Sequence, residues 1–432
     1  MKHKLYMIII SVFVLMVSGC TKTSVSSEKV DSFTKPQYEW GKVSGKTLRV
    51  WGTSPDLERS YVVKAFKRYE ELTGNHLEVV QYKQDEIQER IQEGLAGKRK
   101  LPDIFVTYGG TSMDVYDPDE VFYDFSDAEW VKDLTSVSIN QTVYHGKVVG
   151  LPFWEASISG TLYNKELFEK YHLNVPTTQE EFMEVCDKLL KQGIAPVYMP
   201  AKEISMLLYQ FPMDSIVEDS QVLAALNDFK IGYQDLPQMK EIVKWYKTMA
   251  EKGYFGKSYL YDDWSNMSEA LQSEKYAMLL CWDTWLYTDF KGDPDKFGIF
   301  PAFMGVPENG TFEGPNLNLF AVNRHSENVE AAVDFITFLA DPYNYNYAFE
   351  EILTAPVFKK QVDSMSTPQY LENERLIEKH YHDSIAWLRI KGFSQMDARC
   401  IYEYIHPDTT LSVDEVLQKM DVLRRKRVAD GS

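Results

Sequence analysis

Basic residues are scarce in this chain relative to acidic ones. Its 432 residues include 46 Lys and Arg against 64 Asp and Glu, which gives a formal net charge of −18 at pH 7. Proteins that bind nucleic acid concentrate Lys and Arg against the phosphate backbone, so this deficit argues against a nucleic-acid partner. The hydrophobic and aromatic fractions, 44% and 14%, are nevertheless those of a globular protein, and the length favours two or three domains over one.

Cysteine is also rare, and recognisable catalytic motifs are missing. Three of the four cysteines, Cys186, Cys281 and Cys400, lie outside the N-terminal region and cannot all pair with one another, so we expect buried thiols there. The sequence contains no Walker A, G-x-S-x-G or G-x-G-x-x-G motif, and no CxxC or HExxH metal pattern. We therefore expect neither an enzyme nor a cofactor or metal, although the paired carboxylates of a glycosidase leave no sequence signature.

An apolar run near the N-terminus is too short to span a membrane comfortably. It covers residues 5–17 and follows the basic stretch Met1-Lys2-His3-Lys4, whereas a spanning helix needs about 20 residues. This arrangement is typical of a secretion signal. The run ends in Val17-Ser18-Gly19-Cys20, which resembles a bacterial lipobox. We expect residues 1–19 to be a lipoprotein signal peptide and Cys20 to carry the lipid that anchors the protein to a membrane.

The segment after Cys20 has no hydrophobic period. It includes a stretch rich in Ser, Thr and Lys, so residues 20–45 are expected to form a flexible tether. A lipid anchor and a tether place the folded part outside the cytoplasm. The Lys content suits a Gram-positive cell surface.

Strand and helix patterns alternate after the tether. Residues 47–51 and 77–80 are predicted strands, separated by a helix whose apolar face includes Phe66 and Tyr69 and which ends at Gly74. A second helical pattern leads to the apolar strand 103–107. This order is typical of an α/β protein with a parallel sheet.

Helix caps mark several later elements. Asn164 can cap a short helix, Thr177 or Thr178 can form a capping box with Glu180 or Glu181, and Ser412 pairs in the same way with Glu415. Residues 320–322 read as a strand and 327–340 as a helix. The tripeptide at 380–382, His-Tyr-His, is predicted to lie on a helix surface; it would suit a metal only if it were extended.

An ordered set of segments from about residue 46 to 425 resembles the family 1 extracellular solute-binding proteins. These are the sugar-capturing lipoproteins of bacterial ABC importers and include the maltose-binding type. The segments that carry the resemblance are Thr47 to Trp51 with its helix, Leu101 to Val106, Gly146 to Pro152, Leu162 to Phe168, Val175 to Thr178, Lys275 to Met278 before Trp285, Asn328 to Leu339, and Ala355 to Val357. The chain departs from the family at 281–284 and 314–318, where small residues are usual.

The resemblance implies a two-lobed periplasmic-binding-protein-like fold of type II. Discontinuous α/β lobes are joined by crossover hinges and close around a ligand. The implied boundaries are 46–153 and 313–342 for lobe I, and 154–312 and 343–432 for lobe II. The resemblance further implies a monomer that binds a carbohydrate and interacts with the permease subunits of an ABC importer.

Candidate ligand contacts follow from the rule that pockets lie beyond the carboxyl ends of strands. Sugars offer an apolar face for aromatic stacking and hydroxyls for hydrogen bonding, so aromatic and polar residues at those positions are the candidates. Glu155 and Trp285 also fall near ligand-contacting positions of the family. The predicted contacts are Trp51, Thr53, Asp56, Tyr108, Phe153, Trp154, Glu155, Trp282, Asp283, Trp285, Asn316 and Asn318.

Each candidate has a structural alternative. The tryptophans are equally expected in a core or hinge, Asp56 can stabilise a helix N-terminus, and Asp283, Asn316 and Asn318 suit turns. The acidic stretch 114–120 lacks the glycine and final glutamate of an EF-hand, so a solvated loop is expected. The basic run 424–427 is expected to complement a helix dipole.

Other functions remain open on sequence grounds. The same scaffold can bind a polyamine, which an acidic cleft would favour, or a peptide. A sensor component or an extracellular glycosidase are further alternatives.

Overall fold

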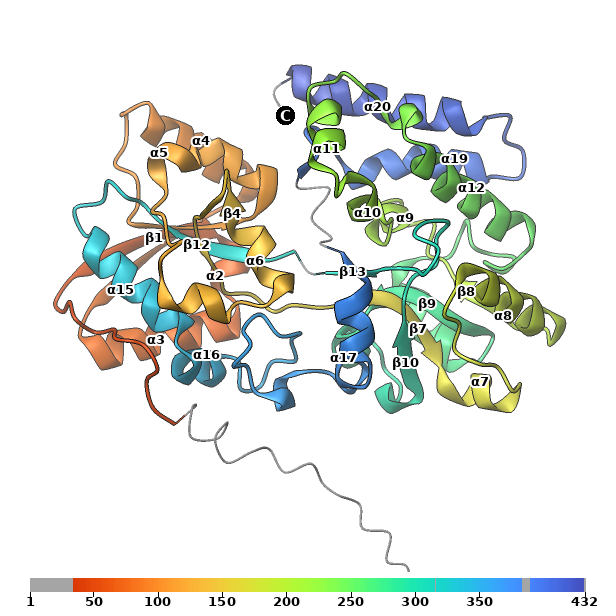
Figure 1. Cartoon of the computed structure of the whole chain (residues 1–432), viewed down its shortest axis with the longest axis horizontal. Coiled ribbons are helices and arrows are strands. Elements are labelled where there is room, and N and C mark those ends of the chain that lie inside the picture. The colour runs from red at the N-terminus through yellow and green to blue at the C-terminus, as the bar shows by residue number, and fades with distance from the viewer. Residues whose placement is uncertain (1–33, 315, 383–388, 431–432) are drawn as a thin grey trace, which may run out of the picture.

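The computed structural model describes residues 34–314, 316–382 and 389–430, which form two lobes with one main sheet each (Figure 1). The expected signal peptide and Cys20 lie outside these residues. No helix in the described part of the chain is both long and apolar enough to cross a membrane.

The sheet of lobe I has the strand order β2-β1-β3-β12-β6. β1 pairs in parallel with β2 and β3, whereas β12 is antiparallel to both β3 and β6. Its strands are β1 (Thr47–Thr53), β2 (His76–Tyr82), β3 (Ile104–Tyr108), β6 (Leu151–Pro152) and β12 (Asn318–Val322). The helices are α2 (Ser54–Leu57), α3 (Ser60–Thr73), α4 (Gln84–Leu95), α5 (Pro118–Val121), α6 (Ser136–Thr142), α15 (Val329–Ala340) and α16 (Pro342–Ala348).

Strands β1, β3 and β12 are buried along most of their length, whereas the edge strand β2 is mostly exposed. Successive side chains of the buried strands point to opposite sides of the sheet and enter two different cores. Val50 and Val106 belong to the large core beneath α3 and α15, and Phe105 belongs to a smaller core with α4. Helix α3 ends as the sequence predicts, since Gly74 adopts a left-handed conformation with φ of 70°. Because β1 and β3 are parallel neighbours, their carboxyl ends lie together at one edge of the sheet.

The second sheet, in lobe II, is built around the antiparallel pair β7 and β9. Its strand order is β13-β11-β7-β9-β8, and β10 also pairs with β7. The strands are β7 (Ser159–Asn164), β8 (Ala195–Tyr198), β9 (Tyr276–Trp282), β10 (Phe297–Phe300), β11 (Phe312–Glu313) and β13 (Tyr381–His382). The helices are α7 (Lys165–Lys170), α8 (Gln179–Lys191), α9 (Met206–Tyr209), α10 (Met213–Val217), α11 (Ser220–Asn227), α12 (Pro237–Glu251), α13 (Met267–Gln272), α14 (Trp285–Thr288), α17 (Pro368–His380), α19 (Arg399–Ile405) and α20 (Val413–Asp430).

Smaller elements complete the described chain. A two-stranded hairpin consists of β4 (Val143–Tyr144) and β5 (Lys147–Val148). The 3-10 turns span Gly110–Tyr116, Glu129–Asp133, Tyr233–Asp235, Trp264–Asn266, Pro294–Lys296, Asp363–Met365 and Gln395–Ala398.

Local capping signals agree with the structure. The Asn164 side chain accepts a hydrogen bond from the Leu167 N–H, and Thr178 accepts one from the Glu181 N–H. Ser412 and Glu415 form reciprocal hydrogen bonds at the start of α20. The helix prediction at 381–382 is wrong, because these residues leave α17 and pair in parallel with β11.

Connections between β6 and β7, β11 and β12, and α16 and α17 link the two lobes in the described chain. The expected lobe boundary at 342/343 falls between α15 and α16. In the structure α16 stays with lobe I, since Tyr345 and Phe349 pack on Phe153, and Phe349 stacks on Tyr61 of α3 with ring centroids 4.3 Å apart. The chain therefore leaves lobe I after α16.

The segment just before β1 also differs from the expected tether. Asp341 accepts hydrogen bonds from the backbone N–H groups of Gln37 and Tyr38 and from the indole Nε1 of Trp40. Asp334 accepts from the N–H groups of Gly41 and Lys42. Residues 37–42 are thus attached to lobe I. Sequence patterns missed this because the segment has no period of its own and its partners lie about 300 residues away.

Candidate functional site

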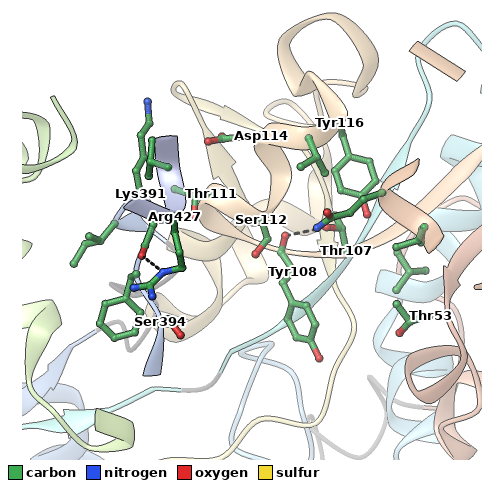
Figure 2. Close-up of a pocket in the computed structure, with 18 of the residues that line it drawn as sticks. Thr53, Thr107, Tyr108, Thr111, Ser112, Asp114, Tyr116, Lys391, Ser394 and Arg427 are labelled. Carbon is green, nitrogen blue, oxygen red and sulfur yellow. Dashed lines mark hydrogen bonds between the residues drawn. The ribbon is translucent and has the colours of Figure 1, made fainter. Parts of the chain in front are cut away.

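A cavity of about 620 Å³ lies between the two lobes (Figure 2). Lobe I contributes Thr53 and Asp56 from the end of β1 and Tyr108 from the end of β3, together with hydroxyls of the following turn. Lobe II contributes residues 390–394 and Arg427 of α20, which Figure 2 shows across from the lobe I side chains. The carboxyl ends of the strands therefore form one wall, as the strand-end rule predicts.

A second cavity, of about 340 Å³, adjoins the first, since Tyr108 lines both. It is formed where the chain crosses between the lobes. Its lining residues are Arg59, Tyr108, Trp154, Glu155, Ser157, Ser159, Tyr209, Trp282, Glu313, Gly314, Asn316 and Gln395. The two cavities together form the interlobe cleft.

The lobe I side of the smaller cavity is organised around Arg59. Its guanidinium forms an ion pair with Glu155 at 2.9 Å and lies 4.9 Å from the centre of the Trp154 ring. Tyr108 meets the same indole edge to face, with ring centres 6.3 Å apart. Burial raises the pKa of Glu155, and the neighbouring Arg59 opposes that shift. The group presents an aromatic surface beside a paired carboxylate.

The lobe II side carries a second aromatic surface. Trp282, at the end of β9, stacks on Trp264 with ring centres 5.0 Å apart and an interplanar angle of 20°. Tyr209 contacts Trp282 at the same centroid distance and is 39% exposed. Aromatic rings thus line the cavity from both lobes.

Polar groups lie deep in the lobe I wall. Thr53 donates a hydrogen bond from its hydroxyl to Asp56, and both side chains are buried. Burial, reinforced by the nearby charge of Asp56, raises the pKa of Tyr108 to about 12, so its phenol stays protonated and can donate a hydrogen bond. The amide oxygen of Asn316 is buried without a hydrogen-bond partner among the described residues.

Seven of the twelve predicted contacts line the cleft: Thr53, Asp56, Tyr108, Trp154, Glu155, Trp282 and Asn316. The other five, Trp51, Phe153, Asp283, Trp285 and Asn318, line neither cavity. Phe153 and Trp285 are core side chains. Trp51 packs edge-on against Tyr82, and Asn318 is fully buried at the start of β12.

Asp283 has a structural environment. Its carboxylate accepts hydrogen bonds from the Ile158 N–H at 2.9 Å and from the Thr367 hydroxyl. Burial raises its pKa to about 6, although these hydrogen bonds act in the opposite direction. The side chain thereby joins the β6–β7 connection to the end of β9 and to the start of α17.

Several lining residues had no place in the sequence prediction. Arg59 directly precedes α3, Tyr209 ends α9, and neither directly follows a predicted strand. Ser157 and Ser159 continue the crossover after Glu155, so their proximity along the chain was an available signal. Residues 390–395 carry no periodic pattern, and only the tertiary fold brings them to the cleft.

Metal ligands do not gather in the described part of the chain. No group of three or more His, Cys, Asp or Glu there has the arrangement of a metal site. In the acidic stretch 114–120, Asp119 contacts His145 and Lys147, which lower its pKa. The three described cysteines are buried free thiols.

Comparison with known proteins agrees with this architecture. The profile of bacterial extracellular solute-binding proteins matches residues 64–375. Over 384 residues, 85% of either chain, the sequence is 22% identical to a multiple sugar-binding protein of Streptococcus mutans.

Solved structures show the same fold. The binding protein MsmE of Bacillus subtilis, in an open conformation, superposes with a TM-score of 0.73 at 19% identity, covering 89% of this chain and 98% of MsmE. Ligand-free RafE of Streptococcus pneumoniae gives 0.70 at 16% identity over 89% and 98% of the two chains, and RafE with raffinose gives 0.65 at 16% identity over 88% and 99%. The predicted two-lobed α/β fold is confirmed, and the chain belongs to the bacterial extracellular solute-binding protein family.

Proposed function

We propose that this protein captures a sugar or oligosaccharide in its interlobe cleft and delivers it to the permease of an ABC importer. The observation that carries the proposal is a cavity lined by aromatic rings from both lobes: Tyr108 and Trp154 from one, Tyr209 and Trp282 from the other. The apolar face of a sugar ring stacks on such surfaces. Closure of the two lobes brings them against opposite faces of the ligand.

The polar groups between the rings suit the hydroxyl rim of a sugar. Ser157 and Ser159 offer donors and acceptors, the Glu155 carboxylate accepts, and the Asn316 amide oxygen gains a partner from a ligand hydroxyl. Such groups fix the orientation of a ligand whose affinity comes mainly from apolar contact.

Relatives support a carbohydrate ligand. Besides the multiple sugar-binding protein, similar structures include RafE in complex with raffinose and a Bacillus licheniformis sugar transporter protein in complex with stachyose. RafE without ligand superposes better than RafE with raffinose, which supports an open, ligand-accepting arrangement of the lobes.

The charges of the cleft do not favour a polyamine. The acidic lining residues Asp56, Asp114, Glu155 and Glu313 are accompanied by Arg59, Lys391 and Arg427. Because Arg59 pairs with Glu155, the aromatic cavity does not present an unopposed negative surface to a polycation.

Calorimetric titration of the secreted chain, made soluble by starting after Cys20, tests the proposal. The ligands are raffinose, stachyose, chitin oligosaccharides and monosaccharides, with spermidine and short peptides as controls. We expect binding to one glycan class, and an affinity loss of about tenfold or more in Trp282→Ala and Tyr209→Ala. Tyr347→Ala removes an aromatic side chain that is 40% exposed, like Tyr209, but lies outside both cavities, so it should bind normally.

Binding of spermidine or peptide without any glycan would contradict the carbohydrate proposal. Equal affinity losses in Tyr209→Ala and Tyr347→Ala would contradict the position of the site. The glycan is also recovered after incubation: an intact ligand supports a binding protein, whereas hydrolysis abolished by Glu155→Gln indicates an enzyme.

We further propose that Cys20 is lipidated and holds a monomer on the outer surface of the cell membrane. The support is the lipobox-like sequence Val17-Ser18-Gly19-Cys20 behind an apolar run. Metabolic labelling with a fatty-acid analogue should mark the natural chain and not Cys20→Ala, which should escape from the membrane fraction. Sedimentation of the soluble chain should give the mass of one copy.

A further inference from the structure

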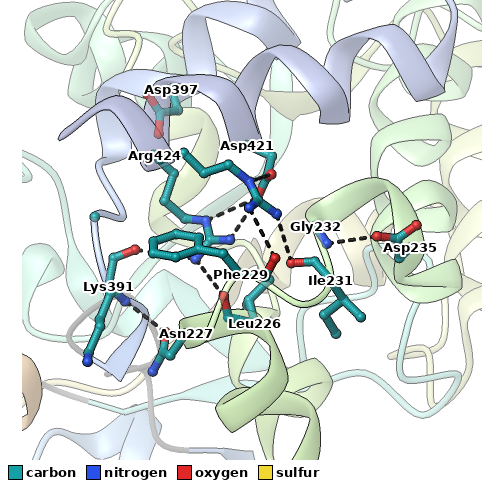
Figure 3. Close-up of polar contacts among 12 residues, drawn as sticks. Leu226, Asn227, Phe229, Ile231, Gly232, Asp235, Lys391, Asp397, Asp421 and Arg424 are labelled. Atoms are coloured by element: carbon teal, nitrogen blue, oxygen red, sulfur yellow. Dashed lines mark hydrogen bonds and ion pairs between the residues drawn. The ribbon is translucent and has the colours of Figure 1, made fainter. Parts of the chain in front are cut away.

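The basic run 424–427 at the end of α20 is partly buried, and its side chains bind other segments of lobe II (Figure 3). The Arg424 side chain is fully buried and donates to Asp421 at 2.7 Å and to the Leu226 carbonyl at 3.2 Å. Only Arg427 lies in the last turn, where a cation complements the helix dipole. The arrangement shows that these residues do more than offset that dipole.

Two of these arginines hold the lobe II wall of the cleft. Arg427 donates from Nε to the Gly392 carbonyl at 2.8 Å, and Arg424 donates from Nη1 to the Lys391 carbonyl at 3.4 Å. The Asn227 side chain accepts a hydrogen bond from the Lys391 N–H (Figure 3). It also donates one to the Arg389 carbonyl. Side chains of α11 and α20 therefore fix the backbone of a segment with little regular structure of its own.

Gly392 shows how closely this segment approaches α20. Its φ is +73°, and a Cβ atom there would lie 2.5 Å from the Arg424 carbonyl oxygen and 2.6 Å from a methyl group of Val428. Only glycine permits both this conformation and this approach. The neighbouring residues 390–394 line the larger cavity, and Gln395 lines the smaller one.

Arg427 also clamps the far end of the wall. Its guanidinium forms a two-point contact with Asp397, whose side chain is 4% exposed, through Nη1 at 3.0 Å and through Nη2. One planar group thus bonds Gly392, within the cavity-lining stretch 390–395, and Asp397, just beyond its end. A lysine carries the same charge but cannot reproduce this fork.

We propose that Arg427, assisted by Arg424, is a positioning residue for ligand binding that holds residues 390–395 against α20, so that they form a fixed lobe II wall of the cleft. The inference rests on the proposed function, because it gives the basic run a role in the affinity of the cleft. If residues 390–395 were mobile in the unliganded protein, they would lose conformational entropy when the ligand binds, and this loss would lower the affinity.

Arg425 provides a matched control on the same helix. It also pairs with a buried aspartate, Asp421, and donates to two backbone carbonyls, those of Phe229 at 3.1 Å and Ile231 at 3.2 Å. Its side chain is 38% exposed against 27% for Arg427. Neither Phe229 nor Ile231 lines the cleft.

The experiment compares Arg427→Gln with Arg425→Gln by hydrogen exchange of the unliganded protein and by calorimetry with the glycan that the wild type binds. In Arg427→Gln we expect about tenfold faster exchange of peptides covering 390–395 and a Kd raised about tenfold. In Arg425→Gln we expect both quantities to stay within about twofold of wild type, because its contacts lie elsewhere. Arg427→Lys replaces Arg427→Gln if the latter does not fold.

Unchanged exchange at 390–395 in Arg427→Gln overturns the inference, whether or not any glycan binds. Equal Kd increases in the two variants, or faster exchange without a change in Kd, also overturn it. If the wild type binds no glycan, the proposed function and the assignment of this wall to glycan binding both fail, and the exchange result still shows whether Arg427 holds the segment.

Discussion

The N-terminal segment 37–42 and the C-terminal helix α20 are attached to the protein by opposite chemistry. On lobe I, the carboxylates of Asp334 and Asp341 accept hydrogen bonds from backbone N–H groups of the N-terminal segment. On lobe II, the guanidiniums of α20 donate to backbone carbonyls of neighbouring loops. In both cases charged side chains form the hydrogen bonds, and their partners are mainly backbone groups of the attached segment.

The two attachments should therefore affect the stability of the fold and the affinity for ligand differently. Asp334 and Asp341 line neither cavity of the cleft, so weakening the N-terminal attachment should reduce stability alone. Arg427 lines the larger cavity, and the wall that it holds borders both. Weakening the C-terminal attachment should therefore reduce stability and affinity together.

The largest expected effect is that of Arg424→Met. Removing one partner of a buried ion pair costs about 3–5 kcal/mol, because the charge and carbonyls left behind lose their partners. Arg425 still contacts Asp421, so the expected loss is about 4 kcal/mol, in the middle of that range. Urea unfolding measures the loss. A variant as stable as the wild type would show that packing alone holds α20.

Asp341→Ala should come second, with a loss of about 3 kcal/mol, since its carboxylate serves three donors of the N-terminal segment and also caps α16 through the Tyr343 N–H. Asp341→Asn keeps the acceptor oxygen and should lose less. Limited proteolysis should then cut within 34–45, while glycan affinity stays at the wild-type value. If Asp341→Ala bound the glycan more weakly than the wild type, the expectation that the N-terminal attachment affects stability alone would be wrong.

Local features of the fold were predictable from the sequence. The caps at Asn164, Thr178 and Ser412 involve residues within a few positions of one another, so their hydrogen bonds leave a readable pattern. The strand-end rule likewise selected Trp154 and Glu155, and both line the smaller cavity. It could not separate Trp154 from its neighbour Phe153, because which of two adjacent side chains faces the cleft depends on packing against α3 and α16.

Long-range attachments were not predictable in the same way. The N-terminal segment and the wall at 390–395 are held through backbone groups, which every residue possesses, so their own side chains carry no signal. Asp341 directly follows the predicted helix 327–340, and Arg427 belongs to the basic run that a helix dipole explains, so neither residue indicated a distant partner. Tyr209 reaches the cleft because of where α9 packs.

Asp283 is a buried carboxylate that belongs neither to the N-terminal segment nor to α20. Its titration makes the stability of the fold depend on pH. Burial raises the pKa of Asp283 to about 6, above the value of about 4 for an unfolded Asp. The folded state then binds the extra proton between these values, so the stability that Asp283 contributes is present below about pH 4 and is lost as the pH rises to about 6. The stability difference between wild type and Asp283→Asn, measured by urea unfolding from pH 4 to 7, should shift against the wild type as the pH rises. A difference independent of pH would contradict this.

The smallest expected effect is that of Tyr38→Phe. The Tyr38 hydroxyl donates a hydrogen bond to Asp133, which also forms an ion pair with Lys360 at 2.9 Å. Because Lys360 remains, the Asp133 charge keeps a partner, and the loss should be about 1 kcal/mol, the net value of a single hydrogen bond. The backbone bonds from residues 37 and 38 to Asp341 are unaffected, so proteolysis within 34–45 should rise far less than in Asp341→Ala. If Tyr38→Phe released the segment as fully as Asp341→Ala, the side chain of Tyr38, and not the backbone, would hold this end of the chain.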